Sequence, residues 1–287
     1  PALFNGIVGL KPTYGRVSCH GVVSQSWTVD HVGPLTRSVA DAAAVLQVVA
    51  GFDSRDHTSS RAPVPDFSSG LGQSIGGLKI GIPCELMEFA LEPAVEAAFN
   101  AARRTFTELG ATVTEISLPR LATAGDVSLD IVMPETTARH AKWLSTRPQD
   151  YGADVRELLE RGRVLTPNYI PAHRLRQQLR FELEMSLHDD VDLLLTPGAP
   201  SVVPRIGQPT IQLGGQDVDF LDALIHFLSP FSLTGLPALT LPAGFDDQNL
   251  PVGIQLIGPA FGEPLVLQAG DAFEHATTWS RCHPALD

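Results

Sequence analysis

The stretch from residue 78 to residue 116, LKIGIPCELMEFALEPAVEAAFNAARRTFTELGATVTEI, contains one complete strand–helix–strand unit. Its first apolar run, residues 78–82, predicts a strand that a proline ends. Residues 93–109 repeat apolar side chains at helical spacing, with proline in the first turn and Gly110 after the last. Residues 111–116 predict the returning strand. A unit of this kind normally places two parallel strands in one sheet with a right-handed crossover.

Strands and helices alternate along the rest of the chain as well. Ser38 is a candidate N-cap of a helix that ends before Gly51, and residues 52–77 predict a long surface connection. The other expected elements are strands at 6–10, 191–195, 238–241 and 252–257, helical segments at 135–190, 219–227 and 264–275, and a loop at 198–216. This order predicts an α/β fold with a central mixed, largely parallel β-sheet flanked by helices. No clean linker interrupts it, so we expect a single domain.

Composition excludes several classes of function. Apolar residues make up 44% and charged residues 18% of the 287 residues, which is typical of a globular protein with a well-filled core. A formal net charge of −12 would repel phosphate backbones, so we expect no direct nucleic-acid binding. No apolar run reaches the roughly 18 residues that span a membrane. Three widely spaced cysteines form no disulfide framework, which favours a reducing, cytoplasmic compartment.

Polar residues of the N-terminal loop give weak catalytic signals. Asp30 and His31 lie close to Ser24 and Ser26, so a Ser/His/Asp site could be imagined there. Residues so close in one loop rarely reach triad geometry, because a triad is assembled from distant segments. We therefore predict loop-ordering hydrogen bonds instead. Lys11 could act as a base only if burial perturbed it, and beside a proline we predict a structural role.

Candidate metal ligands are also sparse. Two Cys-His dipeptides, at 19–20 and 282–283, each offer only two ligands, whereas zinc requires at least three from the protein. We therefore predict no metal. Glu135 and His140 are five residues apart on an expected helix, so they do not share a face well, and a helix-surface position is predicted for both.

Several motifs, in order, carry a family resemblance. Residues 1–37, PALFNGIVGLKPTYGRVSCHGVVSQSWTVDHVGPLTR, are similar to the closing part of the amidase signature, in which G-G-S-I-R-x-P-A leads into G-x-x-G-L-K-P-T-x-G-R-x-S and then D-x-x-G-P-x-T-R. Residues 38–60, 191–207, 229–244 and 250–277 resemble later segments of the family in the family's order. The chain therefore looks like the C-terminal part of an amidase-signature hydrolase. The resemblance implies that family's fold, with residues 1–287 as the C-terminal portion of a single amidase domain whose N-terminal part is missing here.

The resemblance also implies a mechanism. Family members use a Ser–cis-Ser–Lys site, in which the lysine takes the proton of the nucleophilic serine through the bridging serine. The nucleophile attacks an amide carbonyl, backbone N–H groups stabilise the oxyanion, and water resolves the acyl-enzyme without any cofactor. In G-G-S-I-R-x-P the nucleophile stands four places before the proline. If that proline is Pro1, all three catalytic residues precede the chain, so we expect the chain alone to be inactive and poorly folded.

Five substrate-pocket candidates remain. Thr13, Asp30 and His31 follow closely on the expected nucleophile strand, and His226 and Phe227 precede a region that borders the acyl pocket in this family. Loop or core packing is the alternative for each of them.

The expected function is hydrolysis of a small carboxamide. One alternative is the A subunit of a tRNA-dependent amidotransferase, which releases ammonia from glutamine for a partner subunit. The other is a non-catalytic remnant that binds a ligand or partner. The expected partner is a small-molecule amide substrate, and a homodimer is a further option.

Overall fold

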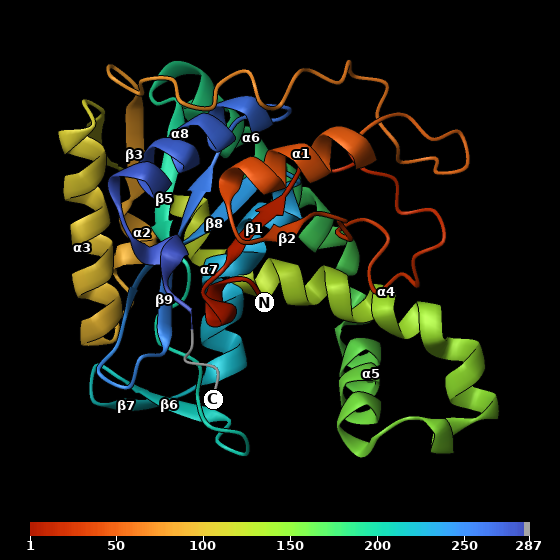
Figure 1. Ribbon diagram of the computed structural model, residues 1–287. Helices are drawn as coiled ribbons and strands as arrows, with labels where there is room; N and C mark the ends of the chain where they lie inside the picture. Colours follow the sequence, from red (N-terminus) through yellow and green to blue (C-terminus); the bar gives the residue numbers. More distant parts are fainter. Residues whose placement is uncertain (284–287) are drawn as a thin grey trace.

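The computed structural model describes residues 1–283, in which helices cover both faces of a seven-stranded sheet (Figure 1). The strands of this sheet are β1 (Val8–Lys11), β2 (Leu35–Thr36), β3 (Lys79–Pro83), β4 (Thr112–Ile116), β5 (Leu193–Pro197), β8 (Ala238–Phe245) and β9 (Pro251–Ile257). Their order across the sheet is β2-β1-β8-β9-β5-β3-β4. Neighbouring strands are parallel for β5-β3 and β3-β4 and antiparallel for the other pairs. Five strands therefore run in one direction and β1 and β9 run against them, which confirms a mixed, largely parallel sheet.

The predicted strand–helix–strand unit is present. Helix α3 (Pro93–Glu108) joins β3 to β4, which pair in parallel from Lys79 opposite Thr112 to Pro83 opposite Ile116. Its apolar stripe is buried, with Phe99 and Phe106 almost fully covered. Because this stripe is buried, the helical spacing of its apolar residues predicted α3 correctly.

Two hydrophobic clusters lie on opposite faces of the sheet. The other helices are α1 (Val39–Val49), α2 (Cys84–Met87), α4 (Ala124–Thr146), α5 (Ala153–Leu165), α6 (Tyr169–Asp189), α7 (Phe220–Thr234) and α8 (Glu263–Ala276). Residues of α1, α3 and α8 belong to one cluster, and residues of α4, α6 and α7 belong to the other. Leu193 and Leu195 of β5 face the first cluster and Leu194 faces the second. Burial on both faces explains the continuous apolar runs of these strands.

Some predicted boundaries are wrong. Residues 198–216 were expected to be loop, yet β6 (Thr210–Leu213) pairs with β7 (Gln216–Asp219) in a separate hairpin. Gly214 and Gly215 both have positive φ, as a two-residue hairpin turn requires. Helix α7 is longer than expected, because it continues through a proline to Thr234 while its apolar face stays buried. The helical region also begins at Ala124, earlier than predicted.

Candidate substrate site

Thr13 ties the N-terminal loop to the start of α8. Its N–H donates to Glu263 Oε1 at 2.8 Å, and its hydroxyl accepts the N–H of Phe261 at 2.8 Å. Arg16 lies beside the same carboxylate, with Nε 3.7 Å from Glu263 Oε2, and the residues Thr13, Arg16 and Glu263 are all buried. These bonds occupy the N–H and hydroxyl of Thr13, which favours the packing alternative. Substrate contact by Thr13 stays a prediction.

Lys11 makes the main-chain hydrogen bonds of the structural role that was predicted, and burial also perturbs it, which was the stated condition for acting as a base. Its Nζ donates to the main-chain carbonyl of Leu236, just after α7, and to that of Pro12. Burial lowers the pKa of Lys11 to about 7, although the negative charge of Glu263 opposes the shift. The amine therefore joins the end of β1 to the turn that leads into β8.

Asp30 organises the loop around it. Its Oδ2 accepts the hydroxyl of Ser24 at 2.7 Å and the N–H of Gln25 at 3.0 Å, while Oδ1 accepts the N–H of Ser26 at 3.0 Å. The hydroxyl of Ser26 donates to Glu135 at 2.7 Å. Both serine hydroxyls are thus committed to carboxylates, which confirms the loop-ordering role and leaves no Ser/His/Asp arrangement here.

His31, the next residue of this loop, has a neutral ring. Its Nδ1 contacts the carbonyl of Val29, and its ring meets Tyr14 edge-on at 5.4 Å between centroids. Burial lowers the pKa of His31 to about 2, and the positive charge of Lys11 acts in the same direction. Because a carbonyl can only accept, Nδ1 carries the proton and Nε2 is left as an acceptor. That Nε2 is buried without a hydrogen-bond partner within residues 1–283.

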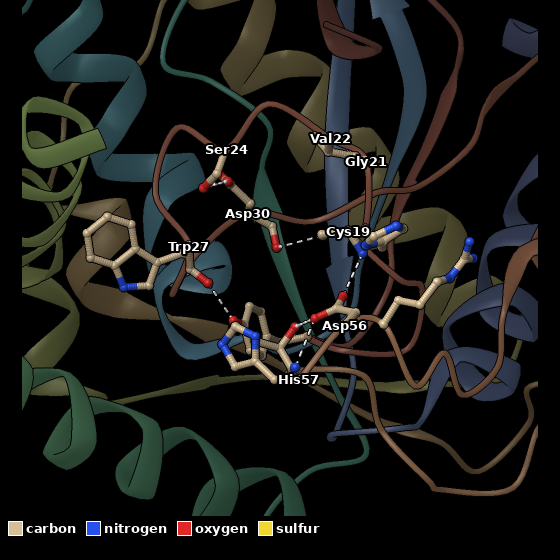
Figure 2. Close-up of a pocket in the computed structure, with 12 residues that line it drawn as sticks. Cys19, Gly21, Val22, Ser24, Trp27, Asp30, Asp56 and His57 are labelled. Atoms are coloured by element: carbon tan, nitrogen blue, oxygen red, sulfur yellow. Dashed lines mark hydrogen bonds between the residues drawn. The ribbon is translucent and has the colours of Figure 1, made fainter. Parts of the chain in front are cut away.

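A cavity of about 250 Å³ lies beside the same loop (Figure 2). Its lining includes Ser24, Trp27 and Asp30 of this loop, Tyr14 and Cys19, and residues 55–58. Of the five substrate-pocket candidates predicted from the sequence, Asp30 alone lines this cavity.

Two groups in this cavity are held protonated. Burial raises the pKa of the Cys19 thiol, and the carboxylates of Asp56 and Asp30 raise it further. Burial also raises the pKa of Tyr14, whose hydroxyl donates to the carbonyl of Trp27 at 2.6 Å. A protonated thiol is a poor nucleophile, so the cavity offers binding groups rather than an activated attacking group.

Glu135 was expected on a helix surface, and this prediction is wrong. The side chain is 1% exposed and accepts hydrogen bonds from Ser26, Thr28 and Tyr169. The sequence does carry a signal for this position. Glu135 continues the buried stripe of α4 that Val127 and Ile131 form at four-residue spacing. His140, by contrast, is only partly buried and contacts Tyr151, outside this network.

His226 and Phe227 form a second group, on α7. The His226 ring lies against Phe89, tilted by 31° with 3.7 Å between centroids, and burial lowers the pKa of His226 while the charge of Asp126 opposes the shift. Its Nε2 is buried without a partner among the residues described. Phe227 is fully buried in the core, and its carbonyl accepts Gln255 Nε2 at 3.3 Å. The structure thus brings Asp30 and His31 together on one loop and places His226 and Phe227 against Phe89 instead.

Neither a metal cluster nor a membrane helix emerges in the part of the chain that the structure describes. No three of its His, Cys, Asp or Glu side chains are grouped as metal ligands. In the two Cys-His dipeptides, Cys19 Sγ contacts the Asp30 carbonyl and Cys282 Sγ contacts the Thr278 carbonyl. None of the helices between residues 1 and 283 combines the length and apolar character needed to cross a bilayer.

Comparison with known proteins gives consistent matches. A family model described as Amidase matches residues 1–267. An amidase of Pseudomonas putida is 39% identical over 289 residues, which cover 100% of this chain and 62% of that protein. The glutamyl-tRNA(Gln) amidotransferase A subunit of Chloroflexus aggregans (strain MD-66 / DSM 9485) is 38% identical over 314 residues, with the same two coverages. A crystal structure of an amidase matches with a TM-score of 0.84 at 35% identity, covering 96% of this chain and 59% of that one. The chain therefore spans about three fifths of the length of these relatives.

Proposed function

The chain belongs to the amidase family, and from this premise we propose that the protein containing it hydrolyses the carbon–nitrogen bond of a small carboxamide. The observation that carries this proposal is the match of the family model over residues 1–267, together with 39% identity to an amidase over the whole chain. The matched region includes both the loop around Asp30 and helix α7. Small-molecule sites are concave and contain a few convergent polar groups, and the cavity beside Asp30 has this character.

We propose that this chain supplies substrate-binding walls rather than the reacting groups. The family resemblance assigns the nucleophile, the bridging serine and the lysine to positions before Pro1. The side chains most able to imitate them are committed elsewhere, since Ser24 and Ser26 donate to carboxylates and Lys11 donates to main-chain carbonyls. Residues 1–287 alone are accordingly proposed to be inactive as an amidase and to form the C-terminal portion of a single amidase domain.

The test uses protein expressed from its complete reading frame. A frame that encodes G-G-S-I-R before Pro1 supplies the serine to be changed to alanine. Release of ammonia from simple amides by the parent protein, and its loss in the serine variant, is the expected result. Undiminished release from the variant, or no release from the parent with any of a panel of small amides, would defeat the proposal.

A second candidate function is glutamine amidohydrolysis as the A subunit of an amidotransferase. The observation that favours it is the 38% identity to such a subunit, almost the same as to the amidase. Glutamine turnover that requires a co-purifying partner subunit would select this function. Turnover of acetamide by the isolated protein would select the stand-alone amidase.

The remaining properties that we propose follow from the same premise. The partner is a small-molecule amide, with a homodimer as a further option. The proposed location is the cytoplasm, in keeping with three cysteines that are free thiols.

A further inference from the structure

Trp27 is held in place by the residues on either side of it. Both neighbours turn their side chains toward Glu135 on α4. Ser26 Oγ donates to Glu135 Oε2 at 2.7 Å, and Thr28 Oγ1 donates to Oε1 at 2.9 Å. The indole between them remains 42% exposed and lies at the edge of the cavity in Figure 2.

The main chain around Trp27 is fixed as well. Its carbonyl accepts the hydroxyl of Tyr14 at 2.6 Å. The next carbonyl, that of Thr28, accepts the guanidinium of Arg176 at 2.6 Å, and the Thr28 N–H donates to Glu135 at 3.2 Å. Residues 26–28 are therefore held by hydrogen bonds to α4, to α6 and to Tyr14 of the N-terminal segment.

The buried carboxylate of Glu135 favours this one position of the loop that carries Trp27. Burying a charge is costly unless hydrogen bonds and an opposite charge compensate it. Glu135 is almost fully buried, and Tyr169 adds a further hydrogen bond to Oε1 at 2.8 Å. Arg176 supplies the opposite charge nearby, since the carboxylate of Glu135 acts to raise the pKa of Arg176 against the lowering effect of burial. Moving the loop away would remove three of the four hydrogen bonds that the Glu135 carboxylate accepts.

A rigidly mounted, exposed indole beside a cavity is suited to binding a flat apolar group. The large ring contributes contact area and stacking, and little conformational entropy is lost when the loop is already ordered. The carboxylates that line the cavity do not call for a cation, because Asp30 and Asp56 each accept three hydrogen bonds from the protein. Cys19 and Tyr14 are held neutral.

We propose that Trp27 is a specificity-determining residue that selects uncharged amides with a flat, apolar group such as an aromatic ring, and that Glu135 is the residue that positions it. That the selected ligand is an amide rests on the proposed function. The binding of a flat apolar group to Trp27 does not depend on turnover.

Benzamide and acetamide are suitable probes, because they share the carboxamide and differ in the ring. The protein, expressed from its complete reading frame, is labelled with fluorotryptophan, and the Trp27 resonance is assigned with W27F. We expect benzamide to shift the Trp27 fluorine resonance and to leave those of Trp143 and Trp279 unchanged, whereas acetamide shifts none of them. In turnover, W27A should lower the ratio of kcat/KM for benzamide over acetamide about tenfold, the size expected for loss of one aromatic contact.

Glu135→Gln tests the positioning role. The amide can accept at one oxygen but cannot replace the second acceptor, so the Trp27 resonance should broaden or move and the benzamide preference should fall as in W27A. Thr28→Val is a milder variant that removes one bond if E135Q fails to fold. Glu182→Gln is the matched control, because this carboxylate accepts from Arg120 at 2.9 Å outside the Trp27 loop.

The outcomes separate the two proposals. An unmoved Trp27 resonance with benzamide, or equal losses for both amides in W27A, would overturn the inference even if amides are hydrolysed. A shifted resonance in a protein that hydrolyses neither amide would leave the Trp27 site standing and would count against the proposed function.

Discussion

Replacing Arg16 with methionine should destabilise the protein strongly, because it removes the guanidinium that is paired with a buried carboxylate. Glu263 is fully buried and keeps one hydrogen bond, from the Thr13 N–H at 2.8 Å. The guanidinium of Arg16 lies 3.7 Å from its second oxygen and also donates to the Pro63 carbonyl at 2.8 Å. At that separation the attraction is about 4 kcal/mol for an effective dielectric constant of about 20. Breaking a buried pair by removing one partner typically costs about 3–5 kcal/mol, so we expect R16M to lower the free energy of unfolding by that amount.

A double-mutant cycle measures this coupling. Chemical denaturation is recorded for the parent protein, R16M, E263M and the double variant, with each protein expressed from its complete reading frame. The double variant should be more stable than the sum of the two single losses implies, because it no longer buries an unpaired charge. R180M is the control, since Arg180 pairs with Glu184 on the exposed face of α6 and should cost less than about 1 kcal/mol. Additive losses in the double variant, or a loss in R16M no larger than in R180M, would refute the reasoning.

Three further predictions concern pH, backbone geometry and the isolated chain. Folding lowers the pKa of His31 from its usual 6.5 to about 2, so below pH 6.5 the unfolded state binds a proton that the folded state does not. The free energy of unfolding should therefore decline as pH falls below about 6.5. H31Q should flatten this decline in thermal melts between pH 7 and pH 4. Gly15→Ala should cost at least about 1 kcal/mol in chemical denaturation, because φ is +79° and the new Cβ would clash with the Thr58 carbonyl oxygen; an unchanged midpoint would contradict this. Residues 1–287 expressed alone should release no ammonia from amides and should aggregate in sedimentation experiments. V48E should reduce this aggregation. A soluble monomer that melts cooperatively would contradict the prediction.

The parts of the fold that could be predicted are those in which local pattern and tertiary burial agree. The α3 unit is such a case, because its apolar stripe has helical spacing and is the stripe that the sheet covers. Ser38 is another, since its side chain caps α1 by accepting the Asp41 N–H, as its type and position suggest. The β6–β7 hairpin was missed although Gly214-Gly215 lies between alternating residues, because the neighbouring prolines and glycines made the whole stretch resemble loop.

The site was less predictable, because its contacts join segments that are distant in sequence. The hydrogen-bonding role of Asp30 is local and could be foreseen from Ser24 and Ser26 nearby. Glu135 is more than a hundred residues from the loop that it holds, and a charged residue on a helix suggests solvent unless its place in the apolar stripe is noticed. The buried Nε2 of His226 has no hydrogen-bond partner among the described residues, and its ring packs against Phe89, which is distant in sequence.

The two ends of the sheet differ in a way that bears on the isolated chain. At the β4 end the edge strand exposes Thr112, Thr114 and Glu115, which are the polar side chains that protect an edge from pairing. At the β2 end, α1 buries one apolar face and also presents Val45, Val48 and Val49 to solvent, with Val48 84% exposed. A helix that is apolar all round is normally covered on every side. The β4 edge is therefore built to face water and the outer face of α1 is not, so we expect aggregation of residues 1–287 alone to begin at α1.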